Sequence, residues 1–313
     1  MKNGRLYGRI ALLMAGIVAI SAGITALTAT VGGRRERYTV VTTVYPLYVA
    51  AQNVIGDESG VTLENLTGAA TGCLHDYQLS PANRISLQRA DLLLLNGAGA
   101  EAFLADILPT LPHLTTVDTG AGLDTLAGHH EHEEHEHEEP NEHEEPNEHL
   151  WVSPRRYAGQ IAAVTDALCA LDPAHAAAYR RNGDAYRARV ETVANELAVL
   201  RQTLAGTPCV LFHDSLAYLA DDLGLLPVAS LTVGEESGVS AADLAEAVSA
   251  VREHPDALVL YDDQYAVRYT AVDSQTARER VLALDCAVLG HGHADDWLTA
   301  MEKNLTLLKG VTR

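Results

Sequence analysis

Short apolar runs alternate with amphipathic stretches over most of the chain, from residue 38 onward. Such runs, separated by helical patterns, are typical of βα units whose strands form a parallel sheet. In the first half, strands are expected at 38–44, 61–66, 92–96 and 115–117, and helices at 46–55 and 81–89. The pattern predicts one α/β lobe in this half of the chain.

The second half of the chain repeats the alternation. Strands are expected at 209–212, 228–231, 257–261 and 286–289. The best marked helix between them begins at Ser240, where Ser-x-x-Asp resembles a capping box, and residues 297–308 form an amphipathic C-terminal helix. This half therefore predicts a second α/β lobe.

A long helical pattern separates the two halves. Asp172 and Pro173 provide an N-cap and a first turn, and only Gly183 interrupts the pattern before residue 204. At about 1.5 Å per residue, this helix would be about 45–50 Å long, which is more than one lobe requires. We therefore predict two lobes of parallel-sheet βα units joined by one long helix, with a binding site in the inter-lobe cleft at the strand ends.

The first 37 residues have a different pattern. Residues 10–31 carry no charge, and basic residues flank them on both sides. Such a segment is typical of an export signal or of a single membrane anchor, and both alternatives remain open. We expect the rest of the chain to lie outside the cytoplasm. The expected organisation is a signal or anchor at 1–37, an N-terminal lobe at 38–158, a helical connection at 159–206 and a C-terminal lobe at 207–313.

One polar run, 128–154, holds seven histidines and ten glutamates, and its residues 138–143 recur identically at 144–149. Imidazole and carboxylate groups bind divalent metal ions, and such a run cannot build a core. We interpret 128–148 as a solvated loop of the N-terminal lobe that collects metal weakly, with an acidic spacer as the alternative. The weak ligands would be His129, His130, His132, His135, His137 and His143.

The charge and the cysteines limit the possible partners and chemistry. A formal net charge of −20 argues against nucleic acid and anionic lipid, because both require a basic face. The cysteine spacing fits no zinc knuckle and no CxxC redox motif, so we interpret the cysteines as structural, with one or two disulfides allowed. They are Cys73, Cys169, Cys209 and Cys286.

Three further histidines stand at the ends of predicted elements. His75 follows a strand, His149 ends the polar run, and His213 lies at the C-terminal end of a strand. Asp262 also ends a buried strand, where a carboxylate needs a partner such as a cation. Three imidazoles and one carboxylate form a four-coordinate set that suits zinc.

At these residues the chain resembles the solute-binding proteins of bacterial zinc and manganese ABC importers. The motifs are GCLHDYQLSP at 72–81, NEHLWVSP at 147–154, FHDSLAYL at 212–219 and DDQY at 262–265, and they follow one another in the family's order. The His-rich insert before the second motif resembles that of zinc-type members. The resemblance covers about 38–313.

This resemblance implies a receptor and not an enzyme. It would capture Zn²⁺ outside the cytoplasm, act as a monomer and deliver the ion to an ABC permease. His75, His149 and His213 would be ligands, and Asp262 stands where the family's fourth ligand varies between a side chain and water. Manganese is the alternative cargo within the family.

Two other classes of protein give weaker matches. Gly97 and Gly99 between a strand and a helix, with Asp118 after the next strand, mimic a dinucleotide-binding fingerprint. His291 and His293 resemble part of a metallohydrolase site, but the sequence contains no HExxH motif, and we expect them to be solvent-exposed loop residues.

Overall fold

The computed structural model describes residues 38–58, 60–68, 77–128, 145–231, 239–264 and 269–311. Residues 38–313 form one compact unit, and both lobes belong to it. The predicted export or anchor segment lies outside the described residues, as do His75 and the six weak ligands of the loop. Among the helices that the structure describes, none is both long and apolar enough to cross a membrane.

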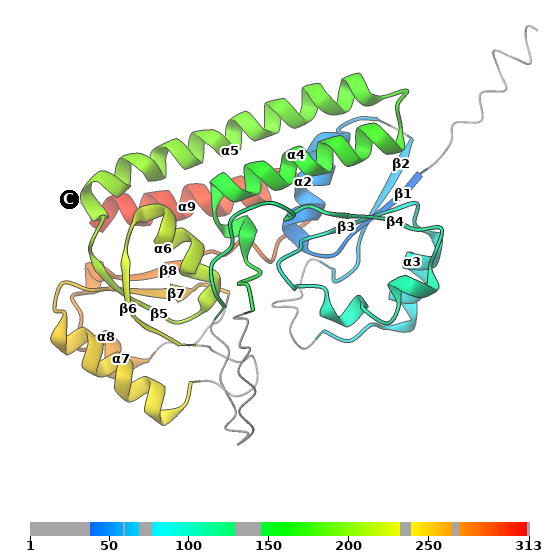
Figure 1. Cartoon of the computed structure of the whole chain (residues 1–313). Coiled ribbons are helices and arrows are strands. Elements are labelled where there is room, and N and C mark those ends of the chain that lie inside the picture. Colours follow the sequence, from blue (N-terminus) through cyan, green and yellow to red (C-terminus); the bar gives the residue numbers. More distant parts are fainter. Residues whose placement is uncertain are drawn as a thin grey trace, which may run out of the picture. The chain divides into compact units, whose positions relative to one another are not determined.

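The N-terminal lobe is built on a four-stranded parallel sheet in the order β2-β1-β3-β4 (Figure 1). Its apolar central strands, β1 and β3, are largely buried, as their sequences predict. The strands are β1 (Tyr38–Thr42), β2 (Val61–Asn65), β3 (Leu92–Leu95) and β4 (Thr115–Asp118). The helical elements are α2 (Tyr45–Ile55), α3 (Pro81–Arg89), η1 (Ala102–Leu104) and η2 (Leu108–Thr110).

The C-terminal lobe repeats this plan with the strand order β6-β5-β7-β8, again all parallel. Its strands are β5 (Pro208–Leu211), β6 (Leu226–Ser230), β7 (Leu258–Asp262) and β8 (Val281–Leu284). Its helical elements are η4 (Asp214–Leu216), α6 (Ala217–Leu223), α7 (Ala241–Glu253), α8 (Thr270–Asp273), η5 (Arg278–Arg280) and α9 (Asp296–Val311). Ser240 caps α7 through Asp243 N, as the capping pattern predicts.

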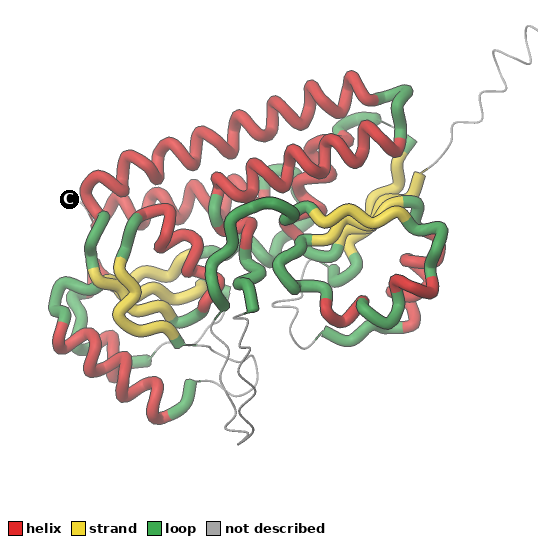
Figure 2. The backbone as a smooth tube through the Cα atoms, in the orientation of Figure 1, coloured by secondary structure: helices red, strands yellow, loops and turns green. Residues whose placement is uncertain are grey.

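A layer of helices joins the two lobes (Figure 2). The turn η3 (Leu150–Val152) leads into α4 (Pro154–Leu171), which packs along α5 (Ala176–Leu204). Helix α5 has 29 residues and contacts α2 of the first lobe as well as α6 and α9 of the second. The prediction of two parallel-sheet lobes bridged by one long helix is therefore confirmed, but the helix begins at Ala176 after the N-cap His175, and Asp172 is instead the C-cap residue of α4.

The prediction of a strand at 286–289 is wrong. The last strand is β8, which pairs with β7 from Val259–Val281 to Asp262–Leu284. The chain then leaves the sheet, because Ala287 has a positive φ of 55° and the carbonyl of Cys286 accepts a hydrogen bond from Trp151 Nε1 at 2.9 Å. Residues 286–288 are buried even so, which explains why their apolar sequence resembles a strand.

The cysteines contribute to packing. Cys169, Cys209 and Cys286 are buried free thiols, and Cys73 lies outside the described residues. No disulfide joins any of the three that the structure describes.

Candidate metal centre

The candidate site lies where the two lobes meet. His213 follows β5 closely and is the N-cap residue of η4, so it stands at the carboxyl edge of the second sheet. His149 is the N-cap residue of η3, in the segment that enters α4. Two segments far apart in the sequence thus bring the two imidazoles together.

The two histidine rings lie against each other. Their centroids are 5.4 Å apart and their planes are nearly perpendicular, at 89°. His149 is 1% exposed and His213 is 4% exposed. A pair of neutral imidazoles buried at this distance can bind one metal ion, since each ring offers one nitrogen lone pair.

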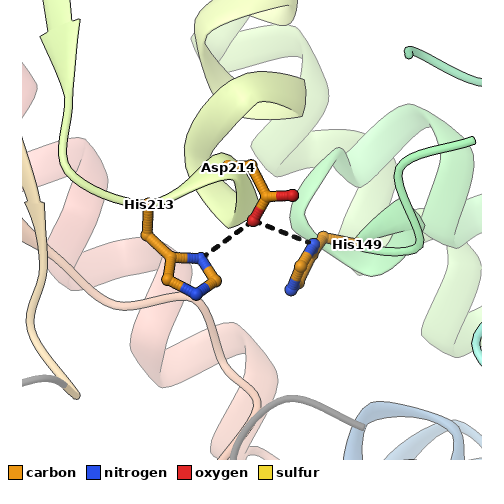
Figure 3. A group of neighbouring side chains, drawn as sticks. All are labelled: His149, His213 and Asp214. Atoms are coloured by element: carbon orange, nitrogen blue, oxygen red, sulfur yellow. Dashed lines mark ion pairs between the residues drawn. The ribbon is translucent and has the colours of Figure 1, made fainter. Parts of the chain in front are cut away.

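Asp214 completes a group of three residues that can hold a metal ion, and it is 6% exposed. In Figure 3, its carboxylate faces the Nδ1 atoms of both imidazoles, and the other ring nitrogens lie on the side away from it. Asp214 Oδ1 lies 3.2 Å from His213 Nδ1 and 3.8 Å from His149 Nδ1. Asp214 was not predicted from the sequence, although its place directly after His213 was a signal.

Asp262 lies beside this group and not within it. It is the last residue of β7, and its Oδ2 accepts a hydrogen bond from Ser215 Oγ at 3.1 Å. Its Oδ1 accepts one from the backbone N–H of Gln264 at 3.0 Å. Burial raises the pKa of this carboxyl to about 6, although these hydrogen bonds lower it. Its role as a fourth ligand stays a prediction, as does that of His75.

The His/Glu loop begins and ends at a short antiparallel stem. Gly128 N donates to Glu145 O at 2.8 Å, and residues Ala127 and Pro146 form a β-bridge. The loop therefore leaves and rejoins the described fold at one point, three residues before His149.

The dinucleotide-binding alternative conflicts with the structure of its glycine loop. The backbone N–H groups of Asn96 and Gly97 donate to the Glu101 carboxylate at 2.7 and 3.1 Å, where a phosphate would otherwise bind. The next helical element is the three-residue turn η1, too short to provide the helix N-terminus that such a site requires.

The metallohydrolase alternative also has a structural explanation. Asp296 Oδ2 accepts the backbone N–H groups of His291 and His293 at 2.7 and 3.1 Å, and Asp296 begins α9. Both histidines are exposed, as expected. In the described part of the chain, His149, His213 and Asp214 form the one group of at least three metal-capable residues.

The two parallel-sheet lobes, the bridging helix and the buried imidazole pair define a solute-binding protein of the metal-importer class. A family model described as the periplasmic zinc-uptake complex component A matches residues 40–311, and the chain belongs to this family.

Curated relatives share about a quarter of the aligned residues. The iron-binding protein YfeA of Yersinia pestis is 28% identical over 224 residues, which cover 70% of this chain and 67% of YfeA. The zinc-binding lipoprotein AdcA of Streptococcus pneumoniae is 27% identical over 280 residues, which cover 87% of this chain. The chain spans about half of AdcA, since the match covers 55% of that protein.

Solved structures have the same fold. The Zn(II)-bound ZnuA-like domain of Streptococcus pneumoniae AdcA superimposes with a TM-score of 0.70 at 25% identity, covering 88% of this chain and 99% of the domain. The solute-binding protein FpvC of Pseudomonas aeruginosa with Ni²⁺ has a TM-score of 0.71 at 20% identity, covering 88% of this chain and 97% of FpvC.

Proposed function

We propose that this protein is a zinc receptor that works outside the cytoplasm, where it captures Zn²⁺ and delivers it to an ABC permease. The observation that carries the proposal is the buried pair of His149 and His213, which come from two different segments at the lobe junction. Membership of the zinc-uptake family, whose description is periplasmic, supports both the cargo and the location.

The donor set favours zinc among the divalent ions. Imidazole nitrogens bind zinc well, whereas manganese prefers more oxygen ligands and stands at the weak end of the series for nitrogen. His75 would add a third imidazole, and Asp262 or water would complete four-coordination. A different divalent ion is the second candidate, because FpvC has been solved with Ni²⁺ and with Mn²⁺ and YfeA is named as iron-binding.

The role proposed is that of a receptor and not of an enzyme. A catalytic zinc site keeps an open position beside a general base. Here the nearest carboxylates already have partners, since Asp214 faces the two imidazoles and Asp262 accepts from Ser215 and Gln264.

Competition with a chromogenic chelator tests the proposal on residues 38–313 prepared metal-free and without an affinity His-tag. We expect one tight zinc site, and we expect His149→Ala and His213→Ala each to weaken it by more than about 100-fold, beyond the usual loss from an outer-shell change. His113→Ala is the matched control, because His113 is exposed and contacts Gln88 instead.

Two results would count against the proposal. If both variants bound zinc as tightly as the parent protein, the site would be elsewhere. If the parent protein preferred Mn²⁺ to Zn²⁺, the metal assignment would be wrong.

A further inference from the structure

Asn147 is a buried amide two residues before His149, and it is 2% exposed. Its Oδ1 accepts the backbone N–H of His149 at 3.0 Å and lies 2.9 Å from His149 Nδ1. Its Nδ2 donates to the backbone carbonyl of Asp214 at 2.9 Å. These contacts fix the amide orientation, because a flipped amide would place its NH₂ against a backbone N–H and its oxygen against a carbonyl.

The orientation of Asn147 determines which nitrogen of His149 carries the hydrogen. An amide oxygen can only accept, so the hydrogen between the two groups belongs to Nδ1. In a neutral imidazole, Nε2 then has the lone pair that a metal ion requires. An outer-shell acceptor on the other ring nitrogen is the usual way in which proteins orient a histidine ligand.

His213 has the opposite arrangement. The backbone N–H of Ser215 donates to His213 Nδ1 at 3.0 Å, so in the neutral ring the hydrogen lies on Nε2. If His213 binds metal through Nε2, its hydrogen must move from Nε2 to Nδ1, and the hydrogen bond from Ser215 N–H to Nδ1 must break, because two N–H donors cannot face each other. Asp214 Oδ1, 3.2 Å from Nδ1, is the acceptor placed to receive the new N–H.

Asn147 itself is held from both sides. Its carbonyl accepts from the Tyr218 hydroxyl of α6 at 2.7 Å, and its N–H donates to the carbonyl of Leu126 at 2.8 Å, in the loop stem. The backbone that carries the side chain beside His149 is therefore anchored on both sides.

We propose that Asn147 is a positioning residue that holds His149 in its metal-binding tautomer before the ion arrives, whereas His213 reaches that tautomer on binding, with Asp214 as acceptor. This inference rests on the proposed function, because it assumes that the two imidazoles bind zinc.

The first test reads the tautomers directly. In the ¹⁵N-labelled metal-free protein near pH 8, where imidazoles are neutral, long-range ¹H–¹⁵N spectra distinguish Nδ1–H from Nε2–H. The signals are assigned by their absence from His149→Ala and His213→Ala. We expect Nδ1–H for His149, Nε2–H for His213, and Nδ1–H for both after zinc is added. A metal-free His149 with the hydrogen on Nε2 would overturn the inference without any change to Asn147.

The second test changes the amide. Asn147→Leu removes the acceptor and should lower zinc affinity by about 10- to 100-fold. In this variant, metal-free His149 should no longer carry its hydrogen on Nδ1 alone. Asn147→Asp keeps an acceptor beside Nδ1 but loses the donor to the Asp214 carbonyl, so it should retain the His149 tautomer and bind zinc more tightly than Asn147→Leu does. The matched control is Asn53→Leu, which removes a half-buried amide that donates to Val49 O at 2.9 Å and to Ala294 O at 2.7 Å, and should leave zinc affinity unchanged.

The outcomes separate the two proposals. A parent protein that binds no zinc would reject the proposed function. A parent protein that binds zinc while Asn147→Leu binds it equally well would reject only the role of Asn147. An Asn147→Asp protein as weak as Asn147→Leu would also reject it, because the amide would then have a merely structural role.

Discussion

Asp214 and Asp262 are buried carboxylates in the same part of the molecule, but their surroundings differ. Asp214 Oδ1 faces two imidazole Nδ1 atoms, whereas Asp262 is joined to the segment after His213 through the Ser215 hydroxyl. A carboxylate beside the Nδ1 atoms can orient the imidazoles as ligands, whereas a carboxylate that binds the ion as the fourth ligand occupies a position that water can also fill.

We predict that Asp262→Ala weakens zinc binding less than His213→Ala does. Water can occupy the coordination position that the carboxylate would leave, although the site then loses one negative charge. Chelator competition on the two variants checks this, with Asp263→Ala, a half-exposed partner of Lys303, as the control. An Asp262→Ala protein as inactive as His213→Ala would show that this carboxylate is an essential ligand.

Glu101 offers a test of pH dependence outside the metal site. Burial raises the pKa of its carboxyl from 4.5 to about 7, although Thr43, Asn96 and Gly97 donate hydrogen bonds that lower it. The unfolded chain releases this proton near pH 4.5 and the folded chain near pH 7. The stability contributed by this group is therefore full below about pH 4.5 and is lost as the pH rises to about 7.

We predict that Glu101→Gln removes the part of the pH dependence of folding stability that comes from this carboxyl group. Urea unfolding of the metal-free proteins at about pH 5 and pH 7.5 measures the free energy of unfolding. Between these pH values, the free energy of unfolding of the parent should fall by up to about 2–3 kcal/mol more than that of the variant. Parallel stability profiles for the two proteins would contradict the raised pKa.

His149 and His213 could be identified from the sequence because they stand at segment ends in recognisable motifs. Asn147 and Asp214 were not identified, since their roles depend on contacts with the imidazoles that only the fold creates, although Asp214 stands directly after His213. The Asn147 side chain reaches the backbone of a residue 67 positions away, and no local pattern predicts which distant carbonyl an amide will meet. The side chains nearest the imidazoles could therefore be identified only once the fold was known.

At the scale of elements, the close packing of α4 against α5 depends on Gly183. A Cβ at this position would lie 2.2 Å from Thr165 Oγ1 of α4. Gly183, which interrupts the helical pattern in the sequence, thus lets the two helices approach each other at this point, although glycine in a helix usually costs about 1 kcal/mol.

We predict that Gly183→Ala destabilises the protein by about 1–3 kcal/mol through overpacking, and that adding Thr165→Ala restores part of the loss. Gly310→Ala in α9 is the control, because nothing lies within 4 Å of its Cβ position, and it should not destabilise. Denaturant titration of the parent, the two single variants and the double variant gives their free energies of unfolding, and from these the coupling energy between positions 183 and 165. Independent, additive effects of the two changes would show that the helices do not meet at this pair.

Most elements were predictable because their periodicity is strong and their caps are marked, as at Ser80 and Ser240. The last strand was not, since two short apolar runs, 281–284 and 286–289, lie on either side of Asp285. Their amino-acid composition does not show which of the two runs forms the strand. Only hydrogen bonding to β7 selects the first run as the strand, and Trp151 binds the carbonyl that begins the second.

At the scale of the whole chain, the closed stem of the His/Glu loop separates the loop from the site. Gly128 and Glu145 are joined by a backbone hydrogen bond, so the residues between them can be exchanged without lengthening or shortening the described fold.

We predict that replacing 129–144 by a short Gly/Ser linker removes weak zinc sites and leaves the tight site unchanged. The loop histidines would have to be ordered on binding, whereas His149 and His213 are already held by the fold. Isothermal titration of the parent and the loop variant measures both classes of site. Loss of the tight site in the variant would contradict this division.

The lobe junction also contains both tryptophans of the chain. Trp297 donates to the carbonyl of Trp151 at 3.0 Å and stacks on Tyr157, and the Trp151 ring lies 5.3 Å from that of His149. All indole emission of the protein therefore originates at the place where an ion would be bound. A Trp297→Phe protein would emit from Trp151 alone, so occupancy of the neighbouring imidazole could be followed in real time by intrinsic fluorescence, with no attached dye.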